Sequence, residues 1–251
     1  MRTQLKGRDE SSFAKVLPPG GSSVLTEWLN AIARYKQPNR RIAAGCQLFR
    51  PGESRREIIE ILEGWAFLYV LFADGSRQIL SFVLPGAIVG FHPAQEEVAT
   101  YGLEALTDLL FAPYLVSSST LYQRHPEIGM RLAWLLSRDL SLAFDHLAIV
   151  GRLSARERVA HLLLELFVRE RMRWPGHRVE DVYLPLTQEH LADATGLTGV
   201  HVNRMLRDLK KQGIIEFQYH RLRILDPDRL LEVAALDPLI LRSWLRADEV
   251  G

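Results

Sequence analysis

Two short helix patterns lie on either side of a single glycine in the last third of the chain. Thr187 is placed to cap a first helix over residues 188–195, because its hydroxyl can accept a hydrogen bond from a free backbone N–H group. Gly196 supplies the tight turn, and Thr198 caps a second helix that Gly213 ends. A helix, a three-residue turn and a second helix predict a helix-turn-helix.

Two short strand patterns follow, over residues 214–217 and 221–225, and predict a wing. Between residues 196 and 225, six cations stand against two acids, Asp208 and Glu216, a local excess of +4 in a chain whose net charge is +1. The cations are Arg204, Arg207, Lys210, Lys211, Arg221 and Arg223. Such an excess is typical of a surface that binds nucleic-acid phosphates, and a winged helix that contacts only protein is the alternative.

The second helix has two distinct faces when its residues are spaced at about 100°. Its core face carries Val202, Met205, Leu206 and Leu209, and its opposite face carries Val200, Arg204, Arg207 and Lys211, flanked by His201 and Asn203. In a major groove, Arg204 can bind guanine O6 and N7, Asn203 can pair with adenine, and Val200 can touch a thymine methyl. The candidate DNA-binding residues are Thr187, Gln188, Thr198, Gly199, Val200, His201, Asn203, Arg204, Arg207, Lys211 and Arg221.

The segment from residue 41 to about 116 has a different pattern, in which glycines separate short apolar runs. Such runs, bounded by turn residues, indicate an antiparallel barrel or sandwich. Asp74-Gly75 is a strong hairpin signal, because this pair tolerates the positive φ of a tight turn. The segment predicts an antiparallel β-roll of about eight short strands. With the helices that follow, the expected fold class is α+β.

A long helix pattern comes next, and its apolar residues step by 3, 4, 3, 4 and 3, the seam spacing of a coiled coil. The seam consists of Ala133, Leu136, Leu140, Ala143, Leu147 and Val150. Packing of this helix on its own β-roll is the alternative, but alanine at two of the six places favours close approach of two identical helices. The seam therefore predicts a symmetric homodimer.

Several classes of protein are excluded or disfavoured. Cys46 is the only cysteine, so one chain can build neither a disulfide nor a four-thiolate metal site, and we expect this residue to be small and buried in a strand, with a redox switch as the alternative. The N-terminus lacks the apolar core of a signal peptide, and the longest uncharged apolar stretch, 64–73, is too short for a bilayer. With no membrane segment and no catalytic motif, we expect a cytoplasmic protein that is not an enzyme.

The β-roll, the long helix, a hinge helix capped by Ser154 and Glu157, and the winged helix-turn-helix together resemble the Crp/Fnr family of bacterial transcription regulators, over residues 41–225. The most specific stretch is 184–215, LPLTQEHLADATGLTGVHVNRMLRDLKKQGII. In this family the recognition helix often begins Ser/Thr-Arg-Glu-Thr-Val and has an arginine near its middle. Thr198, Val202 and Arg204 match those places, whereas Gly199 and Val200 replace the usual arginine and glutamate. The resemblance implies that Arg204 reads guanine and that the target half-site differs from the family's best-known one.

The resemblance also divides the chain into five expected parts: an N-terminal extension with a short helix (1–40), a cyclic-nucleotide-binding-like β-roll (41–124), a dimerisation helix (125–152), a winged helix-turn-helix domain (153–229) and a C-terminal helical tail (230–251). The expected function is that of a homodimeric transcription regulator that binds double-stranded DNA at a palindromic site and contacts RNA polymerase. The alternative is a ligand-sensing regulatory subunit whose winged domain docks a protein partner.

A cyclic nucleotide is a poor ligand for this β-roll. Family members that bind cyclic AMP use a Gly-Glu pair and an arginine, whereas this chain has Gly90-Phe91 and no Lys or Arg between Gln78 and Gln123. The family's iron–sulfur sensor needs four cysteines. Haem ligation by His92 or Cys46 is disfavoured, since a lone histidine before a proline is typical of a turn. We therefore expect no cofactor, and either an uncharged small-molecule effector or none.

Overall fold

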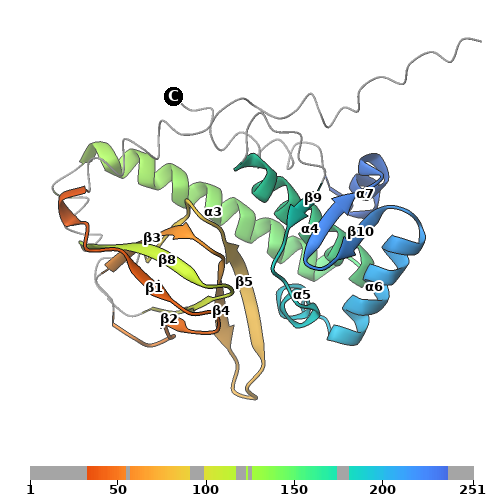
Figure 1. Cartoon of the computed structure of the whole chain (residues 1–251), viewed down its shortest axis with the longest axis horizontal. Coiled ribbons are helices and arrows are strands. Elements are labelled where there is room, and N and C mark those ends of the chain that lie inside the picture. Colours follow the sequence, from red (N-terminus) through yellow and green to blue (C-terminus); the bar gives the residue numbers. More distant parts are fainter. Residues whose placement is uncertain are drawn as a thin grey trace, which may run out of the picture.

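The computed structural model describes residues 33–54, 57–90, 99–116, 123, 126–173 and 181–236. Figure 1 shows two small β-sheets on one side, a long helix crossing the molecule, and a compact group of helices with a small sheet on the other side. This arrangement confirms the α+β fold class. No helix in the described part of the chain is long and apolar enough to span a membrane.

The N-terminal part is a roll of two four-stranded antiparallel sheets. One sheet has the order β1 (Arg40–Ile42), β8 (Leu109–Leu115), β3 (Glu57–Glu63) and β6 (Ile88–Val89). The other has the order β2 (Gln47–Phe49), β7 (Gly102–Ala105), β4 (Ala66–Leu71) and β5 (Arg77–Val83). The predicted eight-stranded roll is therefore confirmed, and β5 forms one edge of its sheet.

Strand β4 shows why its sequence is apolar without interruption. Ala66 and Leu68 point into the core between the two sheets, whereas Phe67 and Tyr69 join a second core that is continuous with the C-terminal helices. Successive side chains of a strand point to opposite faces, so a strand covered on both faces needs apolar residues throughout. The outer face of this sheet is thus the surface on which the C-terminal part packs.

Two turns depend on local chemistry. Gly75 closes the β4–β5 hairpin with φ of 82°, and the Asp74 carboxylate accepts hydrogen bonds from the Ser76 N–H and hydroxyl, which lowers the pKa of Asp74. The predicted Asp-Gly turn is confirmed. Gly64 also has a positive φ, of 82°, and a Cβ there would collide with the Asp108 carbonyl oxygen. Both positions therefore favour glycine.

Two long helices follow the roll. Helix α3 spans Pro126–Arg152, and α4 spans Ala155–Met172. Ser154 and Glu157 form the predicted capping box: the Glu157 N–H donates to Ser154 Oγ at 3.4 Å, and the Ser154 N–H donates to Glu157 Oε2 at 2.6 Å. Almost every residue of α4 from Val159 to Val168 is fully buried, so this helix is the central core element of the C-terminal part.

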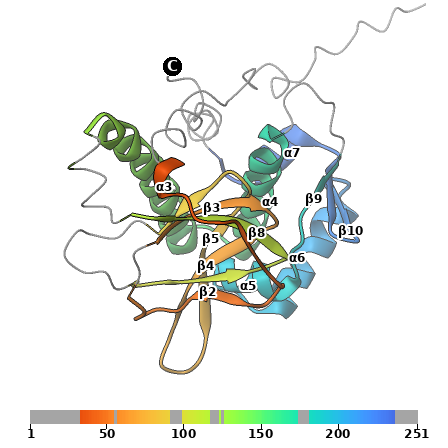
Figure 2. The same cartoon turned by 60° about the vertical axis from the view of Figure 1, so that its left-hand side comes forward.

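The C-terminal elements surround α4. They are β9 (Asp181–Tyr183), α5 (Gln188–Thr195), α6 (Gly199–Lys211), β10 (Ile215–Gln218), β11 (Arg221–Ile224) and α7 (Pro227–Val233), and the sheet has the order β10-β11-β9. Figures 1 and 2 both show α5 lying against the β-roll, with α6 on the outer side. The helix-turn-helix is therefore held at the junction of the two parts.

Three sequence-based expectations need comment. Cys46 is exposed in the turn before β2, so the prediction of a buried strand residue is wrong. The final helix begins at Pro227, earlier than the expected 230, because Asp226 caps it and accepts a hydrogen bond from the Arg229 N–H at 3.1 Å. The short helix expected within residues 1–40 lies outside the described residues except for the short 3-10 turn η2 (Ala33–Tyr35), and residues 237–251 of the tail lie outside them entirely.

Candidate nucleic-acid interface

The caps predicted for the two helices are present. The Thr187 hydroxyl accepts a hydrogen bond from the His190 N–H at 3.2 Å, and the Thr198 hydroxyl accepts one from the His201 N–H at 3.3 Å. Gly196 ends α5 in the left-handed conformation, with φ of 66°. These three residues fix the length of α5 and the angle at which α6 leaves the turn.

The two predicted faces of α6 are also confirmed. Val202 and Leu209 are fully buried, and Met205 and Leu206 pack against the same core. The side chains of the opposite face, Val200, Arg204, Arg207 and Lys211, are all exposed, with Val200 at 78%. A valine this exposed on the first turn gains nothing from its own fold, so it is available to a partner.

A shallow groove runs between the start of α5 and the first half of α6. Its lining consists of Thr187, Gln188, Glu189, Gly199, Val200, Asn203 and Arg207. Asn203 Nδ2 donates a hydrogen bond to Gln188 Oε1 at 2.9 Å, so the two helices share one polar edge. Glu189 also lines the groove and is an acid outside the predicted set of DNA-binding residues.

The charges around α6 are partly neutralised. Arg156 of α4 forms an ion pair with Asp208 at 3.2 Å, so this acid of α6 does not oppose an anionic partner. Arg221 pairs with Asp181 at 3.1 Å, which ties its guanidinium to the sheet of the wing. Among the described residues, Arg204, Arg207 and Lys211 have no ion pair. The available positive charge is therefore concentrated on α6.

The tip of the wing was not singled out by the sequence. Tyr219 and His220 have φ of 51° and 61°, and Tyr219 is 91% exposed. The His220 carbonyl accepts a hydrogen bond from the Leu184 N–H at 2.7 Å, and its Nδ1 lies 3.2 Å from the Leu186 carbonyl. The tip thus lies beside the residues that lead into α5. The sequence signal that could have indicated this tip is an aromatic residue in a two-residue hairpin turn, where Asn-Gly is usual.

The predicted seam of α3 does not pack on its own β-roll. Leu136, Leu140, Leu147 and Val150 are 39%, 52%, 72% and 37% exposed, and Ala133 and Ala143 are also exposed. Phe144, which the seam pattern omitted, is 61% exposed beside it. Leu142 instead packs against the core shared with the roll and α4. Among its described side chains, α3 therefore has one side that packs on the core and one exposed apolar side.

Residues 78–123 of the β-roll include no Lys or Arg. Glu104 of β7 accepts a hydrogen bond from the Arg77 guanidinium at 3.4 Å, and Arg77 is also held by Asp193 at 2.9 Å. His92 and Phe91 lie outside the described residues. In the described ranges no group of three or more His, Cys, Asp or Glu side chains could hold a metal ion.

Comparison with known proteins agrees with this arrangement. Residues 157–233 match the Crp-like helix-turn-helix domain, and residues 39–113 match the cyclic nucleotide-binding domain. The chain is 31% identical to the nitrogen fixation regulation protein FixK of Bradyrhizobium diazoefficiens, over 81% of this chain and 86% of that protein. It is 33% identical to the transcriptional activator protein FnrL of Cereibacter sphaeroides, over 79% of this chain and 81% of that protein.

A solved structure gives the same result for the fold. The structure of FixK2 from Bradyrhizobium japonicum is similar with a TM-score of 0.71 and 26% identity, covering 80% of this chain and 98% of that chain. The likeness extends over the roll, the long helix and the winged domain together, and the identity to FixK and FnrL extends over most of each protein. The chain therefore belongs to the Crp/Fnr family of transcription regulators.

Proposed function

We propose that this protein is a homodimer that binds a two-fold symmetric DNA site through α6, the start of α5 and the wing. The observation that carries the proposal is the exposed face of α6, where three cations without an ion pair among the described residues lie beside Asn203 and Val200. Cations in this position bind phosphates, and a polar or apolar first turn contacts base edges.

Each residue of the α6 face has a distinct role. Arg204 binds guanine, and Val200 contacts a thymine methyl. Asn203 pairs with adenine, and its hydrogen bond to Gln188 fixes the amide plane while leaving one N–H and the carbonyl oxygen for the base. The other candidate residues surround these three and contact the phosphate backbone of the DNA. They are Thr187, Thr198, Gly199, His201, Arg207 and Lys211. Arg221 contributes least, because Asp181 already holds it.

The exposed apolar side of α3 supports the homodimer. A seam of six exposed residues at 3 and 4 spacing buries apolar surface only against a second helix. A two-fold axis along this helix places two copies of α6 on one side of the dimer. We expect the two DNA half-sites to lie about one helical turn apart, roughly 34 Å. RNA polymerase is the protein partner that would contact the dimer when the dimer is bound to DNA.

Control does not run through cyclic AMP or an iron–sulfur cluster. The segment from Gln78 to Gln123 contains no Lys or Arg to pair with a cyclic phosphate, and a single cysteine cannot supply four thiolates. Apolar side chains such as Phe49, Leu103 and Phe111 fill the space between the two sheets of the roll. These residues suit an uncharged effector or none.

The test is selection of bound sequences from a random duplex pool with the full-length protein and no added ligand. A recovered palindrome supports DNA binding and two-fold symmetry together. The same selection with Arg204→Ala should lose one base preference in each half-site, whereas Arg173→Ala, on the far end of α4, should leave the palindrome unchanged. A protein that binds no duplex at low ionic strength contradicts the proposal and favours a regulatory subunit that docks protein.

A further inference from the structure

Strand β5 is an edge strand whose free side is occupied by side chains of two helices. Among the strands that the structure describes, the order β2-β7-β4-β5 leaves one edge of β5 without a neighbouring strand. The Leu80 carbonyl lies 3.3 Å from His146 Nδ1 of α3, and the Phe82 carbonyl accepts a hydrogen bond from Arg169 Nη2 of α4 at 2.6 Å. The register of β5 against β4 shifts at Leu80, which has no partner on β4. The two helices therefore hold this edge strand at two carbonyls, one on either side of Ser81.

One buried carboxylate connects the two donors. Glu165 of α4 is only 1% exposed; its Oε2 lies 2.6 Å from His146 Nε2, and its Oε1 accepts from Arg169 Nη1 at 2.9 Å. Burial alone would raise the pKa of Glu165, but the charges of His146 and Arg169 hold it at about 2. The carboxylate is therefore ionised, and it requires both partners to remain in place.

The surroundings of His146 require the protonated ring. Both of its nitrogens face oxygens that only accept hydrogen bonds, the Leu80 carbonyl and the Glu165 carboxylate. A neutral imidazole has a single N–H, so only the imidazolium satisfies both. Glu165 raises the pKa of His146 against the opposing effect of burial. The other charged or titratable groups nearby are Arg169 and His161 on α4 and Asp145 on α3 itself.

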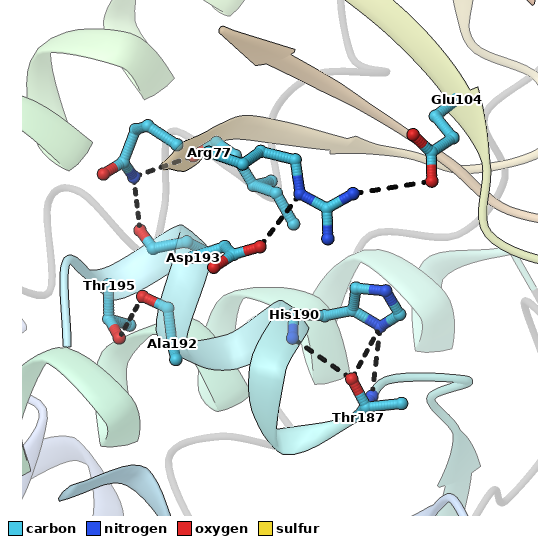
Figure 3. A network of polar contacts seen from close by, with 10 residues as sticks. Arg77, Glu104, Thr187, His190, Ala192, Asp193 and Thr195 are labelled. Atoms are coloured by element: carbon cyan, nitrogen blue, oxygen red, sulfur yellow. Dashed lines mark hydrogen bonds and ion pairs between the residues drawn. The ribbon is translucent and has the colours of Figure 1, made fainter. Parts of the chain in front are cut away.

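The same strand also holds the first helix of the helix-turn-helix. Arg77 Nε pairs with Asp193 at 2.9 Å, and Gln78 Nε2 donates to the Ala194 carbonyl at 3.3 Å. Figure 3 shows Arg77 lying between Asp193 of α5 and Glu104 of the roll. Four residues of β5 thus contact the helices: Arg77 and Gln78 contact α5, Leu80 contacts α3, and Phe82 contacts α4. The DNA-reading face of α6 stays exposed in this arrangement, so these contacts orient α6 without covering it.

We propose that His146, Glu165 and Arg169 form a proton-dependent clamp on the edge of β5, and that this clamp positions the winged domain for duplex binding. The three are positioning residues, because none lies on the α6 face. This inference rests on the proposed function. Two copies of α6 bind one duplex only at a fixed separation, and a domain that is already oriented loses less freedom on binding.

The closed clamp favours the protonated ring of His146, and this determines the direction in which pH changes duplex affinity. The clamp is fully formed below the ordinary histidine pKa of 6.5 and opens as the pH rises through the raised pKa of His146. Duplex affinity should therefore fall toward alkaline pH. Each pKa unit by which the closed clamp differs from the open one corresponds to about a tenfold change in affinity.

The experiment measures the affinity for the selected palindrome by fluorescence anisotropy, at constant ionic strength between about pH 5.5 and 8.5. The duplex affinity of the full-length wild type should fall with rising pH. The duplex affinity of His146→Gln should not change with pH. Arg173→Gln removes a cation at the C-terminal end of α4, outside the clamp and off the α6 face, so it is the matched control and should keep the alkaline loss. A His146→Gln profile that matches the wild type overturns the clamp.

A second readout separates this inference from the proposed function. The readout is the NMR signals of the His146 ring protons, which are assigned by their absence from the His146→Gln spectrum. In the free protein these signals should titrate with a pKa above 6.5. In Glu165→Gln this pKa should be lower. A His146 that titrates at or below 6.5 overturns the clamp even if the duplex binds. A duplex that binds with no pH dependence overturns the positioning role alone, whereas failure to bind any duplex at any pH overturns the proposed function and the positioning role with it.

Discussion

Arg204 and Lys211 lie on the same exposed face of α6 but contact different parts of a duplex in the proposed complex. Arg204→Ala should weaken the best site by roughly 1–3 kcal/mol and relax one base position, because a bidentate guanine contact is lost. Lys211→Ala should weaken all sequences alike and reduce the slope of log affinity against log salt by about one. Anisotropy titrations on matched and single-base-changed duplexes distinguish the two. An equal, sequence-independent loss in both variants would show that Arg204 does not read a base.

Tyr219 tests whether strain at the wing tip serves binding. Its φ of 51° is a conformation that glycine adopts more readily, and holding a non-glycine residue there costs on the order of 1 kcal/mol. Tyr219→Gly should therefore unfold no more easily than the wild type in urea, while its affinity for the palindrome falls. Tyr219→Phe separates the hydroxyl from the ring. A glycine variant with full affinity would assign the tyrosine no part in the interface.

At the scale of the element, α3 carries the test of assembly. Leu147→Glu places a charge on the most exposed seam residue, and a charge buried without a partner should raise the dimer dissociation constant by about a hundredfold or more. Ser141→Glu, on an exposed position off the seam, is the matched control. Analytical ultracentrifugation at micromolar concentration reports both. A Leu147→Glu variant that sediments like the wild type would place the dimer interface elsewhere.

Elements with strong end signals could be predicted to the residue, and elements without them could not. The limits of α5 were found because Thr187 and Gly196 act through their own backbone neighbours. The start of α7 was predicted three residues late because its end signal is ambiguous in sequence: Asp226 followed by Pro227 caps this helix, but the same pair is also typical of a turn. Cys46 was misplaced because a single cysteine beside a predicted strand is usually a small buried residue, whereas the chain turns just before it and leaves it exposed. Local chemistry is visible in a sequence, and burial by distant segments is not.

At the scale of the whole molecule, two kinds of contact join the roll to the winged domain, and their magnitudes differ. The Arg77–Asp193 pair is 25% and 28% exposed, so each partner keeps much of its hydration and the pair contributes less than about 1 kcal/mol. Glu165 is buried, and removing it leaves Arg169 and His146 facing an apolar core. The i,i+4 spacing of Glu165 and Arg169 is visible in the sequence. The contacts of Glu165 with His146 and of Arg77 with Asp193 are not, because they join elements that meet only in the folded chain.

The stability of the molecule should accordingly depend on pH in two windows. Glu165 has a pKa of about 2 in place of 4.5, so its contribution, on the order of 3 kcal/mol, is complete above pH 4.5 and is lost as the pH falls toward 2. His146 has a raised pKa, so its contribution is complete below pH 6.5 and is lost as the pH rises through the raised value.

Urea unfolding of the wild type and Glu165→Gln across both windows measures this pH dependence of the unfolding free energy. The difference in unfolding free energy should be largest between them, near about pH 5 to 6. Arg173→Gln, which removes a cation outside this cluster, should keep both pH windows. A difference between the wild type and Glu165→Gln that stays constant from acid to alkaline pH would mean that the buried carboxylate is held by packing and not by its charge.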